Sequence, residues 1–414
     1  MGKLYTTQLP LLANSSTNAS ISINILCDSL LIEIFQRLPC ISVVRAKSVC
    51  KHWFSLLSNP YFLQSFVSYH EQHVLPFTIV YEFHFWHRYL SDHLHHNLHI
   101  VSEHKKFQSR GFHLGFLPCF RPWELHPIWV VASYKDLLVC CDPKMSLLQG
   151  VYYICNPLTE QWLALPPSLG HHRVADTATG FIITGKIFKL VQVPELESHP
   201  SNSSRFEVNV FCSEVGEWIT FEVTSLRNFA RTWQFKPNAI TFRNTFHWLV
   251  NSTNVVVFDP FDLMRGSCRV IDLPEELNSD MGVCLGSCQD YLAVCQVTGG
   301  CLNGVLVVWK LRDYVTGYWD LECNISFTEM TFVEDLCLCN FRFSAVEVLA
   351  FHPSEYGILY LRFDNQIVIC NVERRTLEMV SECLLDSSLS LGTSGVFPLM
   401  HPCWPSSIPS LPST

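Results

Sequence analysis

A unit that recurs along the second half of the chain constrains the fold more than any other feature of the sequence. Each copy has a short run of β-branched or aromatic residues, a polar turn, and in most copies a later Trp or Leu-Pro pair. The equivalent points are Asn156, Ser213, Asp259, Lys310 and Asn371, which lie 46 to 61 residues apart. This spacing suits one four-stranded β-propeller blade plus a variable loop, whereas a β-sandwich gives shorter, even spacings. We therefore expect residues from about 75 to 396 to form one closed propeller of six or seven blades.

Composition favours the same β-rich body and disfavours some partners. Apolar residues make up 48% of the 414-residue chain and charged residues only 16%, as expected where many strands bury both faces. A chain of this length exceeds what one core usually organises, so a small module beside a large domain is reasonable. The net charge of −9, without a long basic run, argues against nucleic acid as a partner.

The beginning of the chain has a different character. Residues 1–24 are polar and rich in Ser, Asn and Thr, and we expect them to be disordered. From about residue 26 to residue 66 the apolar period is helical. One face of the first expected helix carries Leu30, Leu31, Ile34, Phe35 and Leu38. Asp28 is placed to cap this helix and Pro39 to end it, and two more helices follow, the last ending near Asn59-Pro60.

The cysteines and the lack of targeting segments indicate the compartment. The number of cysteines, 19, is odd, and no export signal or membrane-spanning apolar stretch is present, so reduced thiols and a location in the cytoplasm and/or nucleus are expected. No Cys-x-x-Cys pair occurs, which argues against a zinc site. We expect no metal and no cofactor.

Residues 26–39 have the sequence LCDSLLIEIFQRLP, and they are followed by VVR at 43–45, VCKHW at 49–53 and LLSNPYF at 56–62. In this order and spacing they resemble the F-box, a short helical module. The sequence departs from the family at Cys27, where proline is usual. The remaining chain resembles the C-terminal F-box-associated, kelch-like β-propeller domain of plant F-box proteins. That second resemblance rests on CNPLT at 155–159, FHWL at 246–249, VWKL at 308–311 and LAFHP at 349–353.

The two resemblances imply an α+β multidomain protein in which a small three-helix F-box precedes an all-β propeller-like domain. The expected segments are a disordered tail at 1–24, the F-box at 25–66, a His-rich linker or first propeller strands at 67–124, the propeller at 125–396 and a flexible tail at 397–414.

In that family the F-box binds the small Skp-type adaptor, which attaches to a cullin scaffold. The resemblance implies a non-catalytic, substrate-recognition subunit of an SCF-type ubiquitin ligase, with the propeller binding the target protein. The residues expected to contact the adaptor are Leu26, Leu30, Leu31, Ile34, Leu38, Pro39, Val43, Val44 and Trp53. Each of them could instead only hold the helices together.

Two motifs could suggest other chemistry. Residues 180–186 (GFIITGK) nearly match a phosphate-binding loop, but Ile187 stands where Ser or Thr must hold magnesium, so a hairpin turning at Gly185-Lys186 is favoured. Seven histidines crowd one segment, at His84, His87, His93, His95, His96, His99 and His104. They are the best metal candidates, since His95 and His99 would share one helical face. A polar linker or recognition loop is nevertheless favoured, because no helix is well supported there.

A propeller could also serve functions other than target binding. It could bind a small ligand or glycan, or be a hydrolase with an unrecognised site, although no Gly-x-Ser-x-Gly or dense Asp/Glu motif appears. Target recognition is expected on the face that bears the longer loops, where the polar insert Pro194–Arg205 is the longest. The large aromatics expected to be buried within or between blades are Trp162, Trp218, Trp248, Trp309 and Trp319.

Overall fold

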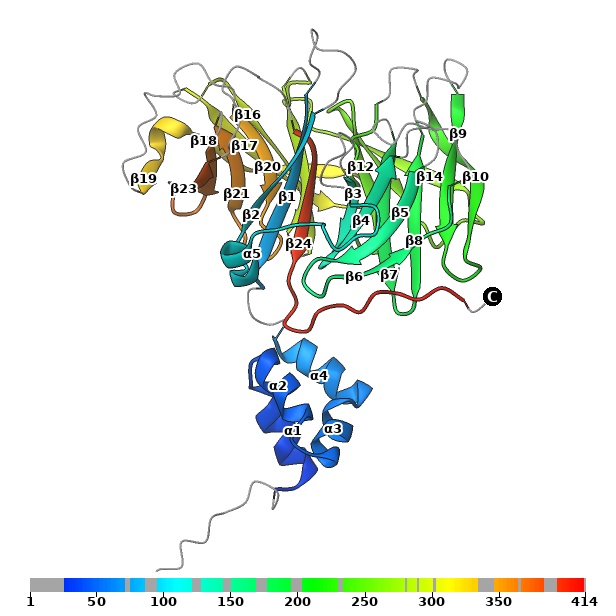
Figure 1. Ribbon diagram of the computed structural model, residues 1–414. Helices are drawn as coiled ribbons and strands as arrows, with labels where there is room; N and C mark the ends of the chain where they lie inside the picture. Colours follow the sequence, from blue (N-terminus) through cyan, green and yellow to red (C-terminus); the bar gives the residue numbers. More distant parts are fainter. Residues whose placement is uncertain are drawn as a thin grey trace, which may run out of the picture. The chain divides into compact units, whose positions relative to one another are not determined.

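The computed structural model contains two compact units, Met1–Gln72 and His73–Thr414 (Figure 1). The residues that the structure describes are 26–70, 75–85, 95–120, 128–143, 150–168, 177–194, 203–229, 234–279, 281–288, 290–300, 303–333, 346–363, 366–382 and 393–412. The expected disordered tail at 1–24 therefore lies outside the described residues.

The first unit is helical. Its helices are α1 (Asp28–Gln36), α2 (Cys40–Lys47), α3 (Lys51–Leu57) and α4 (Pro60–His70). The first three match the expected helices, and α4 was not expected. It begins where the sequence predicted only an end, because proline is well tolerated in the first turn of a helix and Asn59 Oδ1 accepts a hydrogen bond from Tyr61 N at 2.9 Å. Among the described helices, none is both long and apolar enough to cross a membrane.

The start of α1 differs from the expectation that Asp28 caps it. Cys27 occupies the N-cap position and its side chain accepts no capping hydrogen bond, while Asp28 is the first helical residue. The Asp28 carboxylate lies in the first turn, where it interacts favourably with the helix dipole, and 3.0 Å from Nε2 of His52. The helix thus begins on an extended residue without a side-chain cap.

The second unit is a β-propeller with six blades among the described residues. Five blades contain four strands in sequence order, and the sixth, which we call the closing blade, contains β1 (Phe77–Phe85), β2 (His95–Ser102) and β24 (Thr393–Met400).

The first and second blades are β3 (Trp129–Tyr134), β4 (Leu137–Pro143), β5 (Gly150–Asn156) and β6 (Gln161–Ala164), then β7 (Ala178–Thr184), β8 (Ile187–Val193), β9 (Ser203–Cys212) and β10 (Glu217–Phe229). The third is β11 (Ile240–Phe242), β12 (Thr245–Val250), β13 (Asn254–Phe258) and β14 (Ser267–Asp272). The fourth and fifth are β15 (Val283–Cys288), β16 (Tyr291–Thr298), β17 (Val305–Asp313) and β18 (Tyr318–Ser326), then β20 (Val346–Phe351), β21 (Ile358–Phe363), β22 (Gln366–Asn371) and β23 (Thr376–Glu382).

The ring is closed by pairing the two ends of the unit. In the closing blade β1 pairs antiparallel with β24, from Phe77 opposite Met400 to Phe83 opposite Thr393, and the two strands lie side by side in Figure 1. The innermost strand of each blade contacts the innermost strand of the next, in the cyclic order β24, β3, β7, β11, β15, β20. Six apolar clusters fill the spaces between neighbouring blades. Closure covers the apolar sheet faces that the end blades of an open array would expose.

Two short strand pairings link neighbouring blades further. The outer strand β10 of the second blade pairs in parallel with β14 of the third at Thr224 and Ser225. A short strand β19 (Thr331–Val333), which follows the fourth blade, pairs in parallel with β23 of the fifth. These pairings satisfy backbone groups that would otherwise be left at the outer edges.

The recurring unit marks the third strand of each four-stranded blade. Oδ1 of Asn156, Asp259 and Asn371 accepts a hydrogen bond from a backbone N–H two or three residues later, which closes the turn into the fourth strand. In the fourth blade this contact is made by Asp313, which accepts from Val315 N at 2.8 Å, and not by Lys310. The expected equivalence was thus wrong by three residues in that blade, where β17 ends at Asp313 and is longer than β5, β13 and β22.

The tryptophans follow the expectation in part. Trp218, Trp248 and Trp319 are buried, Trp309 is half-buried, and Trp162 is 43% exposed. Trp218 Nε1 donates to Pro166 O and Trp319 Nε1 to Asp272 O, both at 2.8 Å, so each binds a carbonyl at the outer strand of the preceding blade. Trp162 occupies the same place in the first blade. There the preceding blade is the closing one, which has three strands among the described residues, with helix α5 (Lys105–Arg110) beside β2.

The C-terminal segment 401–412 lies against the propeller, which differs from the flexible tail expected from residue 397. Residues up to Met400 belong to β24, and Ile408 and Leu411 pack on the apolar cluster between the first and second blades. The buried Asp136 accepts from Ser406 N, and Asn156 Nδ2 donates to Ser406 O. The prolines that suggested a loose tail instead suit an extended segment, which runs along the lower edge of the propeller in Figure 1.

Candidate functional site: the apolar surface of the helical unit

The helical unit has a small but well-packed core. The rings of Phe35 and Trp53 meet edge to face with centroids 4.8 Å apart, and the backbone N–H of Trp53 donates to Cys50 Sγ at 3.4 Å, which caps α3. The most deeply buried apolar residues are Leu31, Phe35, Val43, Leu57, Phe62 and Phe66. Two residues of α4 are among them, so the unexpected fourth helix completes this core.

The structure divides the nine residues expected to contact an adaptor into two groups. Leu31, Val43 and Trp53 are at most 8% exposed, so they hold the helices together. Leu30, Ile34 and Val44 are 39–46% exposed, which is unusual for three aliphatic side chains in so small a unit. Pro39 is also exposed, and Leu26 and Leu38 are half-buried.

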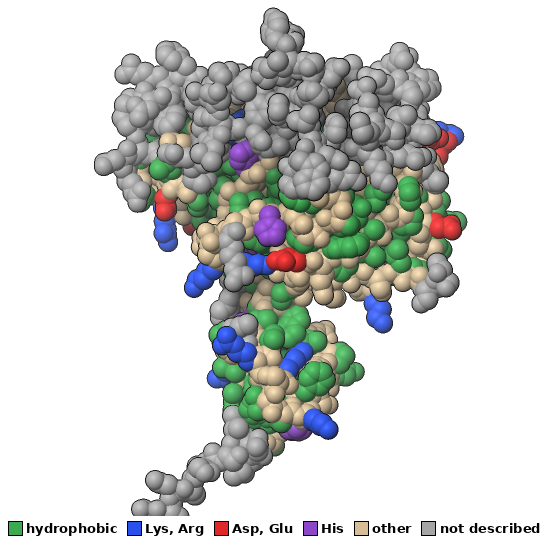
Figure 2. Space-filling model, viewed as in Figure 1, with side chains coloured by type: hydrophobic (Ala, Val, Ile, Leu, Met, Phe, Trp, Pro, Cys, Tyr) green, Lys and Arg blue, Asp and Glu red, His purple; other side chains and the backbone are tan. Residues whose placement is uncertain are grey.

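Several exposed apolar residues of the same unit were missed by the sequence analysis. Val49 is 63% exposed, Phe54 58%, Tyr61 82% and Tyr69 37%. The spacing contained the signal for Phe54, because Trp53 and Leu57 are four residues apart and share the buried face of α3. Phe54 therefore had to point away from the core. Figure 2 shows apolar side chains beside Lys and Arg on the visible surface of this unit.

The charges around this surface are predominantly basic. Arg37 pairs with Glu33 at 2.7 Å, but both side chains are more than half exposed, so the pair contributes little to stability. Arg45 and Lys47 lie in the last turn of α2, where they interact favourably with the helix dipole, and Lys51 begins α3. An exposed apolar surface with a basic surround suits a protein partner that offers an apolar groove and acidic residues.

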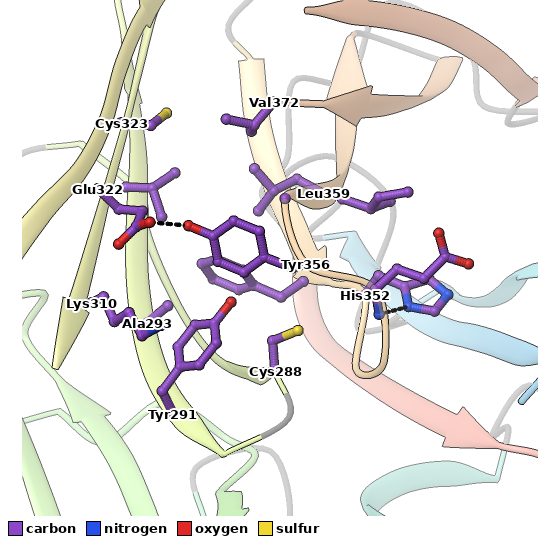
Figure 3. A pocket seen from close by; sticks show the side chains of 15 residues that line it. Cys288, Tyr291, Ala293, Lys310, Glu322, Cys323, His352, Tyr356, Leu359 and Val372 are labelled. Carbon is purple, nitrogen blue, oxygen red and sulfur yellow. Dashed lines mark hydrogen bonds between the residues drawn. The ribbon is translucent and has the colours of Figure 1, made fainter. Parts of the chain in front are cut away.

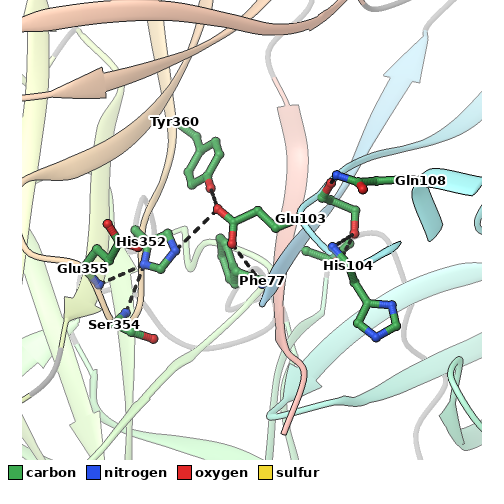
Figure 4. A network of polar contacts seen from close by, with 10 residues as sticks. Phe77, Glu103, His104, Gln108, His352, Ser354, Glu355 and Tyr360 are labelled. Atoms are coloured by element: carbon green, nitrogen blue, oxygen red, sulfur yellow. Dashed lines mark hydrogen bonds and ion pairs between the residues drawn. The ribbon is translucent and has the colours of Figure 1, made fainter. Parts of the chain in front are cut away.

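The propeller holds polar clusters whose geometry is structural. Glu103, which follows β2, accepts a hydrogen bond from Tyr360 at 2.9 Å and from Phe77 N at 3.3 Å, and lies 3.6 Å from His352 (Figure 4). His352 Nδ1 accepts from two backbone N–H groups of the β20–β21 turn. Burial alone would raise the pKa of Glu103, but its contacts with His352, Tyr360 and Phe77 N lower it below the ordinary value. The network joins the closing blade to the fifth blade.

A cavity between the fourth and fifth blades is too small for an organic ligand. Its volume is about 20 Å³, enough for one water molecule. In Figure 3 the rings of Tyr291 and Tyr356 face it, and Lys310 Nζ lies 3.7 Å from the centre of the Tyr291 ring. The Tyr356 hydroxyl donates to Glu322. Lys310 and the Tyr356 hydroxyl thus interact with other residues of the lining.

The two motifs that suggested other chemistry have plain structural roles where the structure describes them. The hairpin β7–β8 turns at Gly185-Lys186, as expected, and Gly185 has a positive φ of 62° that favours glycine. His95 and His99 lie on the strand β2 rather than on a helix, so about 13 Å of strand separates them. His87 and His93 lie outside the described residues. Within the described part, no group of three His, Cys, Asp or Glu side chains could hold a metal ion.

Comparison with known proteins agrees with this architecture. The family model described as F-box protein At3g26010-like, beta-propeller, matches residues 111–394, and the F-box domain model matches residues 23–65. F-box protein At1g49990 of Arabidopsis thaliana is 22% identical over 375 residues, which cover 80% of each chain. F-box protein At5g49610 of the same plant is 26% identical over 319 residues, covering 72% of this chain and 78% of the relative. F-box protein At3g26010 is 24% identical over 314 residues, covering 74% and 69%.

A helical unit with an exposed apolar surface, followed by a propeller whose described residues form six blades, fits an F-box substrate receptor. This chain belongs to the At3g26010-like family of F-box proteins with a β-propeller.

Proposed function

We propose that this protein is the substrate-recognition subunit of an SCF-type ubiquitin ligase. Its F-box binds a Skp-type adaptor and, through it, a cullin scaffold, while the propeller binds the protein to be ubiquitinated. The observation that carries the proposal is the exposure of Leu30, Ile34 and Val44 on a unit that matches the F-box model. Burying the exposed part of each of these side chains against a partner stabilises a complex by about 1 kcal/mol.

The chain would act by positioning and would supply no catalytic group. Holding a target lysine beside the ubiquitin-loaded enzyme raises the effective concentration of the two reactants and so the rate of transfer. A receptor of this kind needs two independent binding surfaces. The division of the chain into two compact units, each with its own core, supports that arrangement.

We place this activity in the cytoplasm or nucleus, where the ligase machinery operates on reduced proteins. The thiols support this: all 15 cysteines that the structure describes are free, and the buried pair Cys140 and Cys155 has its sulfurs 3.8 Å apart without a disulfide. Burial raises the pKa of the Cys268 and Cys323 thiols to about 11, so these groups stay protonated and unreactive at neutral pH.

The test is reconstitution with purified components. The full-length protein, mixed with a Skp-type adaptor and a cullin carrying its ubiquitin-loading enzyme, should elute as one complex in size-exclusion chromatography. The same protein lacking residues 26–70 should elute alone. A full-length protein that folds but stays separate from the adaptor at micromolar concentrations would refute the proposal.

A further inference from the structure

The arginines of the propeller divide into two groups by their partners. Those that pair with a carboxylate are Arg205, Arg227, Arg265, Arg312, Arg362 and Arg375. Arg243, Arg269 and Arg374 make no ion pair with any described residue, although the chain has a net charge of −9. Arg243 and Arg269 both lie on the same tyrosine, Tyr314.

The geometry brings two blades together at this point. The guanidinium of Arg243, from the β11–β12 turn of the third blade, lies 5.2 Å from the ring centre of Phe242 and 5.4 Å from that of Tyr314. Arg269, on β14, also lies 5.4 Å from the Tyr314 ring and donates Nη2 to Val315 O at 2.8 Å. Tyr314 and Val315 belong to the β17–β18 turn of the fourth blade. Stacking on the aromatic rings holds both guanidinium groups in place and leaves N–H donors available.

A buried histidine fixes the tyrosine. The Tyr314 hydroxyl lies 2.8 Å from His247 Nε2, and the two rings are 5.8 Å apart. Burial, with a smaller contribution from nearby Arg269, lowers the pKa of His247 to about 4. The imidazole is therefore neutral at physiological pH, and the positive charge of this site comes from the two arginines.

Arg243 is an unfavourable residue type for the backbone conformation of its turn. Arg243 and the next residue, Asn244, have φ of 50° and 61°, the left-handed values of a tight hairpin turn. Asn, Asp or Gly is preferred at such positions, and a bulky residue there is destabilising. Strain of this kind is often retained at binding sites, where the side chain rather than the turn is needed.

The surroundings suit a protein segment as the source of an anion. Val315 is 82% exposed and Tyr318 is 62% exposed, and both lie in or beside the turn that carries Tyr314. Asp313 interacts electrostatically with Arg269, and its Oδ1 accepts hydrogen bonds from the N–H groups of Val315 and Thr316. An incoming anion would thus meet two donors and an apolar rim.

We propose that Arg243 and Arg269, held on Tyr314, bind a carboxylate or phosphate group carried by a segment of the target protein. The inference rests on the proposed function, since it assigns a ligand chemistry to the target-binding propeller. It places target recognition at short turns, whereas the sequence favoured the longer connections. The longest of these, the insert Pro194–Arg205, cannot be compared, because residues 195–202 lie outside the described residues.

The test uses full-length protein and an array of peptides that share one apolar-rich background and differ only in a central Glu, phosphoserine or Gln. The test variant combines Arg243→Asn, which suits the left-handed turn, with Arg269→Gln. The matched control is Arg374→Gln, which removes another propeller arginine that has no carboxylate partner among the described residues. If the double variant does not fold, Arg243→Asn alone decides the question.

The wild type and the Arg374 variant should retain the Glu or phosphoserine peptides about tenfold or more above the Gln peptides, and the test variant should lose this preference. A preference for phosphoserine alone would identify phosphate as the source, and equal retention would identify any acidic side chain. No preference in the wild type, or the same preference in the test variant, overturns the inference. Adaptor binding, measured on the same preparations, reports separately on the proposed function.

Discussion

Replacing Trp218 by Phe tests whether a repeated hydrogen bond joins neighbouring blades. Trp218 is 6% exposed, and its Nε1 donates to Pro166 O of the first blade at 2.8 Å. Phenylalanine keeps most of the ring in place but removes the donor. The hydrogen bond contributes about 1 kcal/mol, and the space left by the smaller phenylalanine ring raises the total cost to about 1–3 kcal/mol.

The chain offers a matched control in Trp162, which occupies the same position of the first blade but is 43% exposed. Trp162→Phe should change stability by less than about 0.5 kcal/mol. In a propeller of roughly 340 residues that unfolds cooperatively, a loss of 1–3 kcal/mol corresponds to a melting temperature lower by about 1.5–4 °C. Circular dichroism melts of the two variants give the comparison. Equal shifts for both variants, or no shift for Trp218→Phe, would refute the reasoning.

Three further outcomes follow from the propeller. Burial lowers the pKa of His247 to about 4 and of His401 to about 3, from an ordinary value of 6.5, so both histidines gain a proton on unfolding at mildly acidic pH. Urea titrations should therefore show full stability above pH 6.5 and a loss of about 2 kcal/mol per histidine by pH 5, which a His401→Gln variant should roughly halve. Gly180→Ala should destabilise the propeller by about 1–3 kcal/mol in the same assay, because its Cβ would lie 2.8 Å from the Phe246 ring. Truncation after Met400 should cost about 2–3 kcal/mol, because it removes the partly buried Ile408 and Leu411 from their cluster at about 1 kcal/mol each together with the hydrogen bonds of Ser406. An unchanged urea midpoint would show that the C-terminal segment is not anchored.

The repeat in the sequence predicted the propeller because four of the blades end their third strand in the same way. An Asn or Asp at that point accepts a backbone hydrogen bond, so the chemistry of the turn is visible in the residue type. The fourth blade was misaligned at Lys310 because its turn residue, Asp313, stands three positions later. The closing blade left no such signal, since it joins β1 and β2 to a strand near residue 400.

Burial of individual residues could be predicted only where the packing partner was also predictable. Trp162 looked like Trp218 and Trp319 in sequence, yet its neighbour is the closing blade, which lacks a covering strand among the described residues. In the helical unit, helical spacing identified the apolar residues but not their orientation. Adjacent residues such as Leu30 and Leu31 point to surface and core respectively, because α4 covers one side of α1.

The central claim is that the exposed apolar residues of the helical unit bind the adaptor. The direct measurement is the affinity of the full-length protein for a Skp-type adaptor by isothermal titration calorimetry, with Leu30, Ile34 and Val44 replaced together by Ala. Each side chain is expected to contribute about 1 kcal/mol, so the affinity should fall about a hundredfold while the melting temperature stays the same. The control replaces the exposed propeller residue Val315 by Ala and should bind the adaptor as the wild type does. Wild-type affinity in the triple variant would contradict the account.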